Sequence, residues 1–108
     1  MKVRFKKRSC VTSWGQYSNG RIALVLLDEE TGEPIAKVSV NVTILIPSTQ
    51  IAVKSWSENE GMLEALMAAG VGTLNESNRS IDCGHAVGYR LDLSDEALKE
   101  CREAGWKG

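Results

Sequence analysis

The chain has few of the residues on which most enzyme sites depend. Among its 108 residues are one histidine, one phenylalanine, two prolines and three cysteines. A Ser–His–Asp or Cys–His site would have to use the single histidine, His85. The glycine-rich phosphate-binding patterns G-x-x-x-x-G-K-[ST] and G-x-G-x-x-G are missing as well. The sequence therefore predicts a protein that is not an enzyme.

Long apolar runs are also scarce. The continuous run at 22–27 has six residues, far fewer than the roughly 20 that a helix needs to cross a bilayer. No apolar signal-peptide segment follows the basic start at 1–8. We therefore expect a cytoplasmic protein without membrane contact, in which cysteines are thiols or metal ligands rather than disulfides.

The charge is unevenly distributed. Five of the 13 basic residues lie within the first eight positions, and the other hundred carry eight basic and 14 acidic residues. The basic residues Lys2, Arg4 and Lys6 alternate with apolar ones, as on the solvent face of an edge strand, where lysines discourage pairing with other chains. The acidic remainder would repel phosphates, so no direct nucleic-acid partner is expected.

Residues 22–46 carry the clearest strand pattern. The apolar run at 22–27 is followed by a polar turn that ends at 32–34, and then by period-2 alternation, which is typical of a strand. One face of this second strand comprises Val38, Val40, Val42, Ile44 and Ile46. An antiparallel hairpin is therefore predicted. Further strands are expected at 3–11, 51–56, 71–74, 79–82 and 87–93.

Two helices are predicted from capping signals. A capping box at 57–60 precedes apolar residues at helical spacing over 62–69, and Gly70 ends this helix. Ser94 caps a second helix, which ends at Gly105. The composition, 43% hydrophobic and 25% charged, indicates one globular domain, 1–108. The predicted fold is α+β, with a mostly antiparallel sheet of about five strands and two helices packed on it.

The cysteines and the histidine form one candidate metal site. A Cys₃His set is a common structural zinc site, and the chain supplies it as Cys10, Cys83, His85 and Cys101. On an extended strand, residues two apart point to the same side, so Cys83 and His85 could face one ion. No C-x-x-C pair supports the site. The alternative is that Cys10 and Cys101 are buried apolar residues, while Cys83 and His85 belong to an exposed turn.

Tryptophan is enriched relative to phenylalanine, three residues to one. Tryptophan and tyrosine are frequent where a side chain packs on one face and meets a partner on the other. The candidate partner-binding residues are Trp14, Tyr17, Trp56 and Trp106. Each could equally be a core residue, and Trp106, between Gly105 and Lys107, is the least expected in the core.

Four segments resemble a family of small proteins carried by bacteriophages and conjugative elements. They are YSNGRIA at 17–23, GEP at 32–34, VNV at 40–42 and VKSWSENEGML at 53–63, the last being the most specific. The resemblance covers residues 17–72, and all four candidate zinc ligands lie outside this range. The family has no assigned activity, so the resemblance implies a mobile-element protein in a bacterial host cell.

That context suggests an inhibitor of host defence. The first hypothesis is an anti-CRISPR-type protein that binds a CRISPR effector nuclease, or another defence complex, stoichiometrically and without catalysis. The alternative is a plasmid or phage accessory or regulatory protein that binds an element-encoded partner and holds one structural zinc ion. A salt-resistant complex with a defence nuclease favours the first, and loss of the target at substoichiometric dose would indicate an enzyme.

Overall fold

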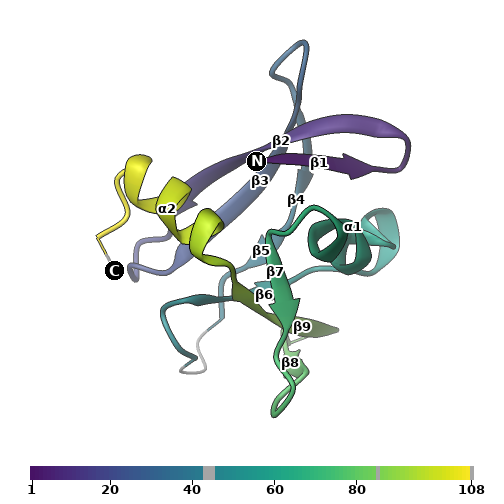
Figure 1. Cartoon of the computed structure of the whole chain (residues 1–108). Helices are drawn as coiled ribbons and strands as arrows, with labels where there is room; N and C mark the ends of the chain where they lie inside the picture. The colour runs from purple at the N-terminus through teal and green to yellow at the C-terminus, as the bar shows by residue number, and fades with distance from the viewer. Residues whose placement is uncertain (43–45, 85, 108) are drawn as a thin grey trace.

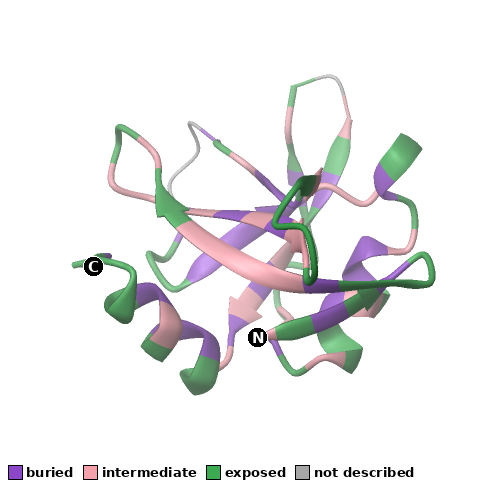
Figure 2. Cartoon of the chain, turned by 90° about the horizontal axis from the view of Figure 1, so that it is seen from above, coloured by how far each residue is buried: buried purple, intermediate pink, exposed green. Residues whose placement is uncertain are grey.

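A four-stranded antiparallel meander forms the first sheet of the computed structural model, which describes residues 1–42, 46–84 and 86–107 (Figure 1). In order across the sheet, its strands are β1 (Lys2–Phe5), β2 (Arg8–Gln16), β3 (Ile22–Asp28) and β4 (Pro34–Lys37). As expected, β1 lies at an edge of the sheet, with Val3 and Phe5 buried and Lys2 and Arg4 exposed, and buried and exposed residues alternate along it (Figure 2). The single strand predicted over 3–11 is wrong, because a turn at Lys6 and Lys7 divides it into β1 and the start of β2.

The second sheet is built around β9. Its strands are β5 (Ser39–Val40), β6 (Gln50–Val53), β9 (Val87–Leu93) and β7 (Gly72–Leu74), in that order, with β8 (Ser80–Asp82) also paired to β9. Strand β7 pairs with the end of β9 and β8 with its start, so both lie along one edge of β9. The side-chain amide of Asn75, between β7 and β8, donates to the Asp92 carboxylate of β9 at 3.0 Å.

Val38 is the point where the chain passes from one sheet to the other. Its amide donates to the carbonyl of Leu24 in β3 at 3.0 Å, and its carbonyl accepts from the amide of Lys54, after β6, at 2.8 Å. The strand predicted over 38–46 was too long, because β5 ends at Val40. Val38, Val42 and Ile46 of its predicted face are buried, and Ile44 lies outside the described residues.

Two apolar clusters lie on opposite faces of the second sheet. The main core joins residues of both sheets with the helices α1 (Met62–Ala68) and α2 (Asp95–Glu103), and includes Ile51 and Val53 of β6. The small core contains Ala52, from the other face of β6. Its buried members are Val42, Ile46, Ala52 and Ile81, with half-buried Cys83 packed against them.

The capping box predicted at 57–60 is wrong. Ser57 has a φ of 56° and begins a short 3₁₀ turn, η1 (Ser57–Asn59), while α1 starts after Gly61, whose φ is 88°. The reason is Asn59, which is only 1% exposed. Its side-chain amide donates to two backbone carbonyls, those of Lys37 at 2.6 Å and Lys54 at 3.2 Å. These two hydrogen bonds hold residues 57–59 in a turn instead of the first turn of a helix.

The other helix signals are confirmed. The Ser94 hydroxyl accepts from the amide of Ala97 at 3.2 Å and so caps α2. Gly70 and Gly105 follow the two helices with φ of 76° and 109°, the left-handed geometry that ends a helix without steric cost to glycine.

The α+β class with antiparallel strands is confirmed, but the strands form two sheets rather than one. The difference arises at Val38, where hydrogen bonds to both sheets divide one alternating segment between them.

Candidate functional site

The three cysteines among the candidate zinc ligands lie in two parts of the fold. Cys10 in β2 and Cys101 in α2 are both fully buried members of the main core. Cys83 follows β8, is half-buried and packs against the small core. His85 lies outside the described residues. Among residues 1–42, 46–84 and 86–107, no three His, Cys, Asp or Glu side chains gather in a metal-binding group.

The chemistry of the thiols follows from their burial. Burial, and secondarily the neighbouring Glu100 carboxylate, raises the pKa of Cys101 to about 11. Burial also raises the pKa of Cys10 and of Cys83. A thiol binds metal as the thiolate, so these environments favour the protonated, apolar form. The positions of Cys10 and Cys101 match the buried-residue interpretation, and the zinc site stays a prediction.

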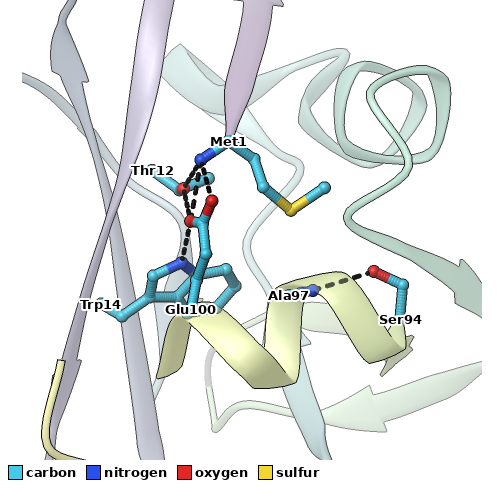
Figure 3. A network of polar contacts seen from close by, with 6 residues as sticks. All are labelled: Met1, Thr12, Trp14, Ser94, Ala97 and Glu100. Carbon is cyan, nitrogen blue, oxygen red and sulfur yellow. Dashed lines mark hydrogen bonds and ion pairs between the residues drawn. The ribbon is translucent and has the colours of Figure 1, made fainter. Parts of the chain in front are cut away.

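Trp14 belongs to a polar network on the side of the first sheet that α2 covers (Figure 3). Its indole Nε1 donates to Glu100 at 3.0 Å, and the Thr12 hydroxyl donates to the same carboxylate at 2.9 Å. The Met1 ammonium lies 2.8 Å from both Glu100 oxygens. Burial acts to raise the pKa of Glu100, but these three donors outweigh it and hold that pKa below its usual value.

The remaining candidate aromatics are also engaged within the fold. Trp106 is 7% exposed and belongs to the main core, so the expectation that it lies outside the core is wrong. The chain turns back after α2, where the Trp106 amide donates to the carbonyl of Cys101 at 3.0 Å. The Tyr17 hydroxyl lies 2.8 Å from the Ser39 hydroxyl. Trp56 is half-buried, with the Lys54 ammonium 5.8 Å from its ring centroid.

The exposed apolar side chains are different residues. Of the large hydrophobic residues that the structure describes, Val87 is 63% exposed, Met67 42% and Tyr89 38%. Val87 and Tyr89 lie two residues apart in β9 and therefore on one face of it. Opposite them in β8 stand Asp82 and Ser80, both exposed. These four residues are called the β8–β9 face below.

Sequence alternation could not distinguish this face from the core. Val87 and Tyr89 share their face of β9 with Leu91 and Leu93, which belong to the main core. The main core covers β9 only at Leu91 and Leu93, so the first residues of the strand, including Val87 and Tyr89, extend past the edge of this core. A signal was present in the paired strand, because Ser80 and Asp82 are polar at the positions that oppose Tyr89 and Val87.

The backbone of the β8–β9 face is firmly held. Tyr89 pairs with Val53 of β6 on one side and with Ser80 of β8 on the other. Between the two apolar residues, Gly88 packs so closely that a Cβ there would lie 2.9 Å from the Cys83 sulfur and 3.0 Å from the Val53 carbonyl oxygen. The exposed side chains therefore project from a well-defined strand.

No protein family, curated protein or solved structure is detectably similar to this chain. Among the described residues, neither helix has the length and apolar character required to span a membrane.

Proposed function

We propose that this protein acts by binding another macromolecule through the β8–β9 face and has no chemistry of its own. The observation that carries the proposal is that Val87 and Tyr89 are exposed by 63% and 38% on one face of β9, which pairs with β8 at both residues and with β6 at Tyr89. Tyrosine is enriched at protein interfaces because one side chain offers both apolar area and a hydroxyl. A strand that is already ordered loses little conformational entropy on binding.

The partner class that we propose is a bacterial defence complex, in the first place a CRISPR effector nuclease. This partner class follows from the mobile-element context that the four segments within residues 17–72 suggest and from the small size of the chain, and no family match adds to it. Binding at this face would inhibit the nuclease stoichiometrically, either by occupying a surface that the nuclease needs for nucleic-acid loading or by blocking a conformational step.

The experiment is a DNA-cleavage assay with a purified CRISPR effector nuclease. The protein is titrated in before guide loading, before target loading and after both. Inhibition that is complete near a one-to-one ratio and depends on the order of addition is the expected result. Absence of inhibition across the effector types would reject the proposed partner class and favour the accessory protein, whose partner an unbiased pull-down would then identify.

A variant pair tests the face itself. The double substitution Val87→Thr and Tyr89→Thr removes exposed apolar area with a residue that strands accommodate well. We expect it to weaken binding by about tenfold or more, the loss typical of central interface residues. Met67→Gln, which removes exposed apolar area from α1, is the matched control and should leave binding unchanged. A folded double variant with full inhibition would exclude the β8–β9 face.

A further inference from the structure

The β1–β2 hairpin concentrates positive charge on a small surface. Its exposed cationic residues are Lys2, Arg4, Lys6, Lys7 and Arg8. The Glu29 carboxylate, 3.0 Å from the Lys2 ammonium, partly neutralises one end. Lys6 donates to the backbone carbonyl of Glu58 at 2.7 Å, which ties the hairpin tip to the turn before α1. The hairpin therefore presents its charge at a defined place beside α1 (Figure 1).

The tip of this hairpin has an unusual sequence for its geometry. Lys6 and Lys7 form the two-residue turn, and both have positive φ, 49° and 67°. Such turns strongly prefer Asn-Gly, because residues with a side chain are strained in the left-handed region. Backbone strain that persists against local preference is often connected with function. Here it places two ammonium groups where asparagine and glycine would be more stable.

A groove of about 300 Å³ runs beside the cationic residues, between β1 and α1. Lys2, Arg4 and Glu29 line it together with Val3, Cys10 and Ala65. Val3 and Cys10 are buried core residues, so the floor is apolar while the rim is mainly cationic. A groove of this kind can hold a small apolar side chain and pair with carboxylates on either side of it.

We propose that the β1–β2 hairpin and this groove bind a short acidic segment of a partner protein, in which an apolar residue is flanked by Asp or Glu. Charge complementarity supports this occupant, since opposite potentials steer and orient a partner. An extended nucleic acid fits less well, because the Glu29 carboxylate beside Lys2 limits the cationic surface to a short stretch. The only aromatic residue of the hairpin strand β1, Phe5, is buried and cannot stack on a base.

The surface is separate from the β8–β9 face. In Figure 1 the hairpin extends to the upper right and β8 lies at the bottom. The inference therefore does not depend on the proposed function, and either can fail without the other.

The test is fluorescence anisotropy of a labelled peptide Glu-Glu-Leu-Glu-Glu with the full chain. Matched probes replace every Glu by Gln, or Leu by Ser, and a 20-nucleotide single-stranded DNA represents the competing partner class. We expect the acidic peptide to bind with an affinity that falls steadily as salt rises. The Gln peptide should bind at least tenfold more weakly and the Ser peptide several-fold more weakly. Equal binding of the Gln peptide, or tighter binding of the DNA, would overturn the proposal.

The variants separate binding from folding. Lys7→Gly removes one charge and relieves the positive-φ strain, so we expect a higher Tm together with weaker peptide binding. Combined with Arg4→Gln, it should weaken binding at least tenfold. Lys99→Gln with Lys107→Gln removes two charges elsewhere, from exposed positions in and after α2, and serves as the control. The assignment would be contradicted if the control lost as much affinity as the hairpin variant. It would also be contradicted if peptide affinity were unchanged both in Lys7→Gly and in Lys7→Gly combined with Arg4→Gln.

Discussion

The two cores of this molecule differ in size and in what they support. The main core draws on both sheets and both helices and contains Cys10 and Cys101 without any exposed surface. The small core consists of four buried residues and half-buried Cys83, and it lies under the β8–β9 hairpin. The main core therefore supplies most of the stability of the fold, whereas the small core packs behind the β8–β9 face and holds it in position through few residues.

Thiol reactivity should show the largest contrast between the two cores. In the native protein, Ellman's reagent should modify Cys83 first, because its side chain is half-buried, whereas Cys10 and Cys101 become accessible only when the main core opens. Since opening of a stable core costs several kcal/mol, we expect their rates to be at least about 1,000-fold slower.

Three thiols that react at one rate in folded protein would contradict the two-core comparison. Three protected thiols, together with release of one zinc ion on unfolding, would instead support the candidate zinc site.

Truncation of one buried side chain in each core comes next. Leu26→Ala in the main core should lower the free energy of unfolding by about 3 kcal/mol, because it leaves a cavity in fully buried surroundings. Ile81→Ala in the small core should cost about 2 kcal/mol, since fewer neighbours lose contacts there. Urea unfolding measures both. A larger loss for Ile81→Ala would show that the small core is the more critical of the two.

A glycine pair tests how tightly the small core is packed. Gly88→Ala places a Cβ 2.9 Å from the Cys83 sulfur and 3.0 Å from the Val53 carbonyl oxygen, so we expect a loss of about 1.5 kcal/mol. Gly15→Ala in β2 meets only the Ala23 Cβ at 3.9 Å and should change stability by less than about 0.5 kcal/mol. Thermal unfolding compares the two, and equal losses would mean that Gly88 has room for a side chain.

A smaller effect than those of Leu26→Ala, Ile81→Ala and Gly88→Ala is expected at Glu100, at the edge of the main core. Its pKa is below the ordinary value of 4.5, so its contribution to stability is present above that pH and is lost as pH falls through the pKa of the folded state. Glu100→Gln should cost about 1 kcal/mol at pH 7, because the side chain is partly exposed. Unfolding at pH 7 and below pH 4.5 tests this, and a loss of equal size at both would contradict the assignment.

The sequence predicted most of the local structure. Ser94, Gly70 and Gly105 mark helix ends through hydrogen bonds and backbone angles that depend on adjacent residues, and all three expectations are confirmed. The strands expected at 3–11 and 38–46 were too long, and the segment 57–60, whose pattern is that of a helix start, forms a turn. The buried amide of Asn59 bonds there to the carbonyl of Lys37, 22 positions earlier, a contact that no local pattern contains.

The surroundings of the candidate partner-binding residues were harder to predict, and their role in binding stays a prediction. Tryptophan composition pointed to Trp14 and Trp106, but the first donates to Glu100 and the second is buried in the main core. The strand expected at 87–93 is present, but Val87 and Tyr89 are exposed while Leu91 and Leu93, on the same face, are buried. Periodicity identifies which residues share a face of a strand, but it does not show how far the neighbouring elements extend over that face.

From the sequence alone came the α+β class, the antiparallel strands, the C-terminal ends of both helices, the start of α2 and the cationic edge strand, because each depends on residues close together in the chain. Only the tertiary structure decided that the strands divide into two sheets at Val38, that Cys10 and Cys101 lie apart from Cys83, and that Val87 and Tyr89 are exposed. The physical reason is that burial and sheet pairing depend on segments distant in sequence, whose packing no local pattern encodes.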